Sequence, residues 1–131
     1  MRWRSEVSSV VMSIQFEYLY RDASNNKRWG NVVFAGSFDR LLDERLRRSL
    51  HDGEWFIATQ VRLPELFFAE YPLDQDDHCW HEFHSLTACD AMPSDTHKRT
   101  IRQLIVEFER AKAEGWREYD RARSFREFGV G

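Results

Sequence analysis

A short stretch near the middle of the chain gathers side chains of the kind that ligate transition metals. The sequence DDHCWHEFHS contributes Asp76, Asp77, His78, Cys79, His81, Glu82 and His84. Imidazole, thiolate and carboxylate groups bind zinc, copper and iron in proteins. The candidate metal ligands are His78, His81 and His84. A metal-dependent hydrolase or nuclease would use one of them as ligand or general base, with Asp22 and Glu82 as partners.

The spacing of these residues supports a metal site less clearly than their types do. On a strand, even-numbered and odd-numbered residues take opposite faces, so His81 is separated from His78 and His84. On a helix, the spacing of three aligns the histidines, but Trp80 and Phe83 then fall on different sides. The chain has no HExxH, paired CxxC or EF-hand motif. The alternative is a strand whose histidines and tryptophan pack against helices, with no cofactor.

Nucleophilic catalysis has less support in the sequence. Cys79 lies beside two histidines, but adjacency in sequence does not place a base against the sulfur. The serines lack a nucleophile-elbow context, and the chain has neither a P-loop nor a GxGxxG motif to hold phosphates. A function without catalysis is favoured, and an enzyme is the alternative.

A second group of polar and aromatic residues surrounds an expected β-hairpin. Its members lie on both sides of the turn sequence DASNNK and are Tyr20, Arg21, Asn25, Arg28 and Trp29. An aromatic ring beside arginine and asparagine can hold a nucleobase by stacking and hydrogen bonds. The same residues are also typical of a tight hairpin with a capped polar turn. The group predicts either a nucleotide or small-ligand trap or an ordinary hairpin.

The charges are unevenly distributed along the chain. Its 19 Lys+Arg and 22 Asp+Glu give a net charge of −3, which argues against general nucleic-acid binding. Residues 63–97 contain acidic residues throughout but no lysine or arginine. Such a segment predicts docking on a basic protein surface, with fast association that salt weakens. The expected contact residues are Asp74, Asp76, Asp77, Trp80 and Glu82, and the alternative is a solvated loop.

The pattern of apolar residues predicts a two-layer α+β domain. Residues 14–21 alternate between apolar and polar side chains and form an expected hairpin with residues 30–35. A helix is expected at 38–50 after an N-cap at Ser37, followed by strands at 54–61 and 79–86. A second helix begins at Ser94 or Asp95 and ends at Gly115. This ββαββα order favours a four-stranded, mostly antiparallel sheet with both helices on one face.

The ends of the chain differ from this central domain. Residues 1–11 are expected to form a loose extension or an extra strand, residues 12–115 the domain, and residues 116–131 a helical or flexible tail. Met12 is an alternative natural start. The sequence shows no apolar run that could span a bilayer, no signal peptide and only two cysteines, so a reducing cytoplasm is expected. The aromatic tail is the expected contact of a homodimer.

Two segments carry a resemblance to other proteins. FEYLYRDASNNKRWGNVVF and DDHCWHEFHSL are similar to segments of small bacterial and phage-borne proteins with a YLYRDA–N–K–WG opening and a D–H–WHEF strand. The resemblance covers residues 16–85 and implies no catalytic or binding residue, because those proteins have no known activity. As small proteins of mobile elements, they imply a binding role, as inhibitor or ligand trap. The sequence thus predicts a non-enzymatic binding module with a basic protein partner.

Overall fold

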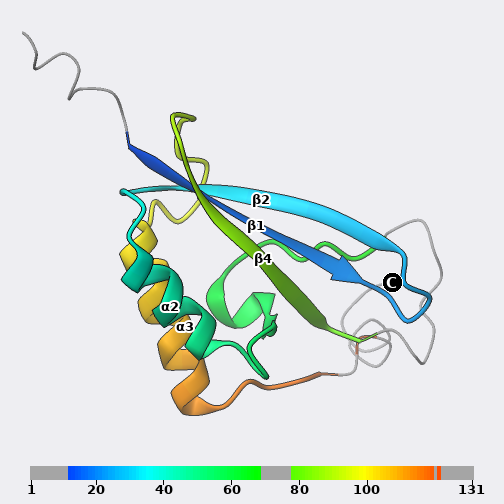
Figure 1. Cartoon of the computed structure of the whole chain (residues 1–131). Coiled ribbons are helices and arrows are strands. Elements are labelled where there is room, and N and C mark those ends of the chain that lie inside the picture. The colour runs from blue at the N-terminus through cyan, green and yellow to red at the C-terminus, as the bar shows by residue number, and fades with distance from the viewer. Residues whose placement is uncertain (1–11, 69–77, 120, 122–131) are drawn as a thin grey trace, which may run out of the picture.

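The computed structural model describes residues 12–68, 78–119 and 121. Strands β1 (Ser13–Arg21), β2 (Lys27–Ala35), β3 (Trp55–Ile57) and β4 (Trp80–Cys89) form one antiparallel sheet in the order β2-β1-β4-β3. Helices α2 (Arg40–Ser49) and α3 (Ile101–Glu114) lie side by side on one face of it, and the 3-10 helix η1 (Ala58–Val61) follows β3 (Figure 1). The predicted α+β architecture, with four strands and two helices in this order, is confirmed.

Phe16 in the central strand β1 shows how the layers are joined. Its ring is fully buried and contacts one ring from each strand and one from α3, namely those of Tyr18, Phe34, Phe56, Phe83 and Phe108. The ring centroids are 5.2–6.4 Å apart, which is the range of favourable tilted and edge-to-face pairs. The alternation of residues 14–21 therefore marks the strand on which the core is built.

The turn between β1 and β2 uses the polar residues that the sequence offered. Asp22 Oδ1 accepts the backbone N–H groups of Ser24 at 3.0 Å and Asn26 at 2.8 Å. Asn25 takes a left-handed conformation with φ 68°, which asparagine tolerates better than most residues. These contacts make DASNNK a closed Asx turn, so the predicted hairpin is confirmed.

The first helix and the strand after it differ from the prediction. The cap of α2 is Asp39 and not Ser37, because the Asp39 carboxylate accepts the N–H of Leu41 at 2.8 Å. The strand expected at 54–61 ends at Ile57, and the chain continues as η1. Arg62 ends η1 in a left-handed conformation with φ 56°, and its N–H bonds back to the carbonyl of Thr59. Local hydrogen bonds thus replace the sheet ladder over residues 58–61.

The second helix begins later than predicted. Thr100 is its N-cap in a reciprocal capping box with Gln103, and neither Ser94 nor Asp95 caps it. Ser94 Oγ instead accepts the N–H of Val33 at 2.9 Å on the edge strand β2. The carboxylate of Asp95 accepts hydrogen bonds from the buried side chain of Arg99. Both side chains have the residue type of a cap, but Ser94 contacts β2 and Asp95 pairs with Arg99 in the loop before α3.

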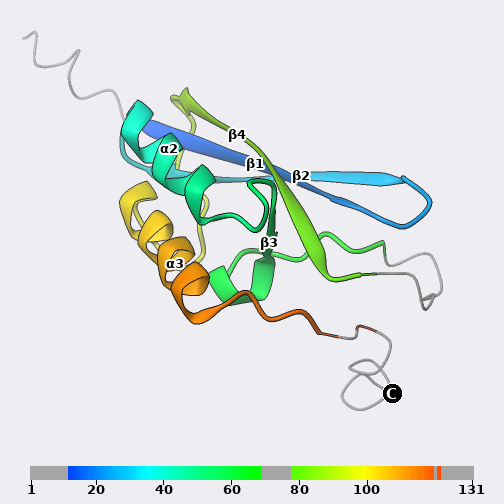
Figure 2. The same ribbon diagram turned by 60° about the horizontal axis from the view of Figure 1, so that its bottom comes forward.

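The residues directly after α3, 115–119, leave the helix and pack against the domain, and the next described residue, Arg121, is helical. Gly115 ends α3 with φ 97°, as predicted. The indole N–H of Trp116 then donates to the carbonyl of Ser49 at 3.0 Å, and Arg121 donates to the Tyr20 hydroxyl at 2.8 Å. Figure 2 shows this segment running from the end of α3 past β3. These contacts attach its described residues to the sheet and to the end of α2.

Several predictions concern residues outside the described ranges. These are the N-terminal extension at 1–11, the part of the acidic segment at 69–77, and most of the predicted tail, at 120 and 122–131. The expected homodimer contact lies largely in that tail. Among the helices of the described residues, none has the length and apolar content needed to cross a membrane.

Candidate functional site

His81, the central histidine of the DDHCWHEFHS stretch, is a core residue. Its fully buried ring packs among four aromatic rings, those of Tyr18, Tyr20, Phe56 and Phe67. Nε2 accepts the N–H of Leu66 at 2.9 Å, and Nδ1 lies 3.3 Å from the carbonyl oxygen of Cys79. Burial lowers the pKa of His81 to about 4. The ring is thus a neutral structural group whose two nitrogens both have backbone partners.

The other two predicted ligands also use their ring nitrogens elsewhere. His78 Nε2 lies 2.7 Å from the carbonyl oxygen of Arg21, and its Nδ1 accepts the N–H of Trp80 at 3.0 Å. His84 is the extra residue of a bulge in β4, is exposed, and lies 3.0 Å from Glu17 Oε1. Within residues 12–68, 78–119 and 121, no three His, Cys, Asp or Glu side chains are placed to hold a metal ion. The geometry of the described histidines thus does not support a shared metal.

The hairpin group is divided between the two faces of the sheet. Tyr20 is buried on the core side, and Arg28 is its partner across the β1–β2 pair. Trp29 lies on the opposite face, with 49% of its surface exposed. Asn25 stays in the turn, where its Oδ1 accepts from Arg21 at 2.6 Å. This division separates residues that a nucleotide trap requires around one ligand.

The acidic segment is only partly an open charged surface. Asp74, Asp76 and Asp77 lie outside the described residues. Three described carboxylates of the segment already have partners: Asp95 with Arg99, Glu82 with Arg21, and Glu65 with Tyr119. Docking through this segment therefore depends on fewer free charges than the sequence suggests.

The structure instead brings residues from three parts of the chain around one cavity of about 360 Å³. The lining residues are Arg21, Asp22, His51, Trp55, His78, Trp80 and Glu82. Trp55 and Glu82 are direct neighbours in the β3–β4 pair, and Trp80 shares their face two residues along β4. His51 stacks on Trp80, with ring centroids 4.8 Å apart and 26° between the planes. We call this cavity the aromatic cleft.

Polar contacts fix the side chains of the aromatic cleft. Arg21 binds Glu82 with two hydrogen bonds, Nε to Oε2 at 2.7 Å and Nη2 to Oε1 at 3.2 Å. Trp80 donates its indole N–H to Glu118 Oε2 at 3.0 Å. Two-point arginine–carboxylate pairs and indole hydrogen bonds set orientation as well as energy. The tryptophan and the ion pair are thus positioned without a ligand.

Carboxylates lie both in the described lining of the aromatic cleft and beside it. Asp22 and Glu82 line it, Glu118 holds Trp80, and Asp52 Oδ2 lies 3.5 Å from His51 Nε2. Among the described lining residues the only arginine or lysine is Arg21, which is paired with Glu82. The cleft therefore presents aromatic faces in a negatively charged surrounding, which suits a cationic group.

The sequence points to parts of this cleft but not to the whole. Arg21 belongs to the hairpin group, whereas Trp80 and Glu82 belong to the acidic segment. Nothing in the sequence singles out His51 or Trp55 as site residues. The available signal is the alternation in EWFI, which puts Trp55 on the face opposite the buried Phe56. Only the antiparallel pairing of β3 with β4 brings these residues together.

The two cysteines are expected to differ in reactivity. Cys79 is buried, its Sγ accepts the N–H of Tyr119 at 3.3 Å, and burial raises the pKa of its thiol, whereas Cys89 at the end of β4 is half-buried. Since the thiolate is the reactive form, iodoacetamide should label Cys89 at least about tenfold faster in the folded protein. Mass spectrometry of pulse-labelled peptides measures both rates. Cys89→Ser should leave the folded protein nearly unlabelled, and rapid labelling of Cys79 there would contradict its burial.

No known protein family, curated protein or solved structure matches the chain. The candidate site is consequently defined by the contacts of the described residues alone.

Proposed function

We propose that this protein is a non-enzymatic binding module that accepts a lysine or arginine side chain of a basic protein partner in the aromatic cleft. One observation carries the proposal: Trp55 and Trp80 lie beside carboxylates around a cavity of about 360 Å³, and the one arginine among its described lining residues is already paired. This proposal keeps the basic protein partner predicted from the sequence. Of the predicted contact residues it uses Trp80 and Glu82, and it adds His51 and Trp55.

The aromatic walls supply the first part of the recognition. A cation above the face of a tryptophan gains about 0.5–2 kcal/mol, with the larger values at desolvated sites. Trp80 is half-buried, stacked on His51 and held by Glu118, so its ring loses little conformational freedom on binding. A ring that is already fixed in the free protein binds a cation with a smaller loss of conformational entropy than a mobile ring does.

The carboxylates supply the second part. Asp22, Asp52 and Glu118 lie on or beside the lining of the cleft and attract a cation from solution. The paired carboxylate of Glu82 lies beside Trp55 on the sheet. Charges of this kind mainly raise the association rate, and salt weakens their effect. Binding should therefore weaken as ionic strength rises.

The proposal predicts binding of a capped tri-arginine peptide through the two tryptophans. In NMR titrations at low salt, the indole N–H signals of Trp55 and Trp80 should shift, whereas that of Trp29 should not. Trp80→Ala should weaken binding about tenfold, which corresponds to a loss near 1.4 kcal/mol of cation–π energy. Isothermal titration calorimetry measures the affinities.

Two controls isolate the cation and the ring. A peptide with citrulline in place of arginine keeps the shape but removes the charge, and it should not bind. Trp29→Ala removes an exposed tryptophan outside the cleft lining and should leave the affinity unchanged. The proposed site would be refuted if the citrulline peptide bound as tightly as the arginine peptide. It would also be refuted if Trp80→Ala bound the arginine peptide as tightly as the wild type does.

A further inference from the structure

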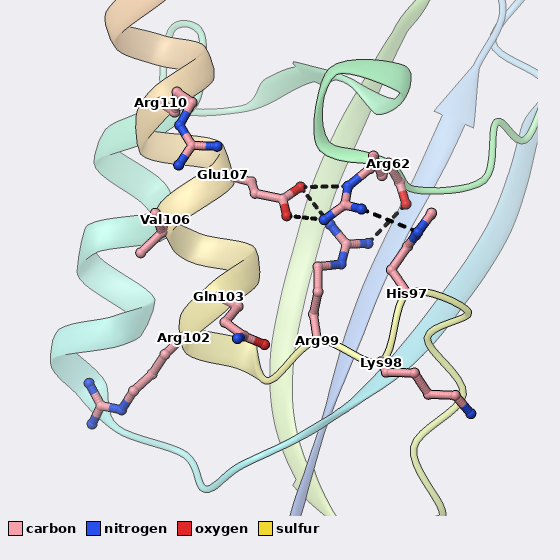
Figure 3. A pocket seen from close by; sticks show the side chains of 9 residues that line it. All are labelled: Arg62, His97, Lys98, Arg99, Arg102, Gln103, Val106, Glu107 and Arg110. Carbon is pink, nitrogen blue, oxygen red and sulfur yellow. Dashed lines mark hydrogen bonds and ion pairs between the residues drawn. The ribbon is translucent and has the colours of Figure 1, made fainter.

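A second cavity, of about 470 Å³, lies between α3, the loop at 97–99 that precedes it, and Arg62 at the end of η1. Its charged lining residues include Arg62, Lys98, Arg99, Arg102, Arg110 and Glu107 (Figure 3). Figure 3 shows Glu107 of α3 reaching toward Arg62 and Arg99 at the centre, with the other cations around them. We call this cavity the basic groove. It shares no lining residue with the aromatic cleft.

The floor of the basic groove is a fixed ion network. The Arg99 side chain, 4% exposed, binds both carboxylate oxygens of Asp95 at 2.9 and 3.0 Å. Its other contacts are the carbonyl of Val61 at 2.6 Å, the carbonyl of Arg62 at 2.9 Å and Glu107 Oε1 at 2.8 Å. Glu107 also accepts from Arg62. This network holds the loop at 95–99, η1 and α3 in one arrangement.

The cations around this floor are less occupied. Arg110 and Lys98 have no ion-pair partner in the part of the chain that the structure describes, and Arg102 lies 3.7 Å from Asp39. An adjoining cavity of about 230 Å³ shares Arg62, Glu107 and Arg110 and adds Arg117, which lies 4.0 Å from Glu114 in the same lining. Basic residues thus continue along one side of α3, and a ligand there would meet several cations.

The rest of the lining indicates what kind of anion fits. Val106, 44% exposed, is the one exposed large hydrophobic residue among the described lining residues, and no tryptophan, tyrosine or phenylalanine lines the groove. Protein partners usually need apolar or aromatic anchors at the centre of their contact. Nucleic-acid contacts are more polar and far more positively charged. Arginine, which predominates here, also suits two-point contacts with phosphate oxygens.

We propose that the basic groove binds the phosphate groups of a polyphosphate chain, either the backbone of a single-stranded nucleic acid or inorganic polyphosphate. None of the described lining residues is a tryptophan, tyrosine or phenylalanine, so the expected contact is with phosphates and not with bases, and phosphate contacts do not depend on sequence. The net charge of −3 weakens attraction at long range, so binding is confined to the groove and to low or moderate salt. This site is independent of the one proposed for the aromatic cleft.

The test uses the full chain and a fluorescein-labelled oligothymidine in anisotropy titrations from 50 to 200 mM salt. The variant Arg102→Glu/Arg110→Glu should weaken binding at 50 mM salt at least about tenfold and flatten the plot of log affinity against log salt by about 1.4, because two single-strand phosphate contacts are lost. The matched control, Arg40→Glu/Lys112→Glu, makes the same change in charge at exposed helix positions that line neither the basic groove nor the adjoining cavity. It should bind within about twofold of the wild type.

Competition identifies the source of the phosphate. Displacement by unlabelled oligothymidine but not by inorganic polyphosphate indicates a nucleic acid, and equal displacement by both indicates a general polyphosphate site. Three results would overturn the proposal: no binding by the wild type at 50 mM salt, equal losses in the two double variants, or displacement by poly-glutamate as effective as by polyphosphate. The last would identify an acidic protein as the partner. Far-ultraviolet circular dichroism checks that each variant is folded.

Discussion

Arg99→Met is expected to lower the free energy of unfolding by about 3–5 kcal/mol, because it leaves a buried carboxylate without its counter-ion. The side chains of Arg99 and Asp95 are each 4% exposed. Burial raises the pKa of the Asp95 carboxyl, but the hydrogen bonds and charge of Arg99 outweigh burial and hold that pKa below its usual value. The variant also removes the donors to the carbonyls of Val61 and Arg62. Urea unfolding at pH 7 measures the loss.

Arg45→Met is the matched control for this prediction. Arg45 also binds a glutamate with two hydrogen bonds, to Glu109 at 2.7 and 2.9 Å, but the two side chains are 32% and 40% exposed. Surface pairs of this kind contribute less than about 1 kcal/mol. If Arg99→Met cost no more than Arg45→Met, burial of the ion network would not be what stabilises the loop at 95–99. Asp95→Asn/Arg99→Met should recover part of the loss, since it removes both buried charges.

This network illustrates what the charge pattern of a sequence conceals. The acidic segment ends at His97, and the next residues are Lys98 and Arg99. Asp95 lies at the end of that segment and pairs across its boundary with Arg99. A count of charges along the chain assigns Asp95 to the acidic segment and Arg99 to the basic residues after it. In the fold the two side chains neutralise each other. The net charge of a segment thus predicts its surface only where its side chains remain unpaired.

The fold was more predictable than the site because its signals are local. The alternation in β1 and the apolar spacing of the two helices depend on neighbours within a few residues, and these elements were predicted correctly. The N-caps were not, because Ser94 has the residue type of a cap but contacts Val33 in β2, and Asp95 pairs with Arg99 in the loop before α3. The aromatic cleft depends on the pairing of Trp55 with Glu82, 27 positions apart in the sequence, which no local pattern specifies.

The stability of the wild type is expected to fall by about 2 kcal/mol between pH 6.5 and pH 5 because of His81. Burial lowers the pKa of His81 in the folded protein to about 4, against an ordinary value of 6.5. Between these values the unfolded chain binds a proton that the folded protein does not. Stability must therefore rise with pH through this window, and it is lost as pH falls. Urea unfolding across the range measures the slope.

His81→Gln removes the titrating group, so the free energy of unfolding should depend less on pH between 5 and 6.5. His84→Gln makes the same substitution at an exposed histidine outside the core and is the matched control. The carboxylates whose pKa the fold lowers, such as Asp95 and Glu107, lose their contribution only at lower pH, which leaves this window to histidine. If His81→Gln does not fold, an NMR pH titration of the His81 imidazole in the wild type tests the lowered pKa directly. An imidazole signal of His81 that titrates near pH 6.5 would contradict the prediction, because it would show that the ring is exposed to solvent and not buried in the core.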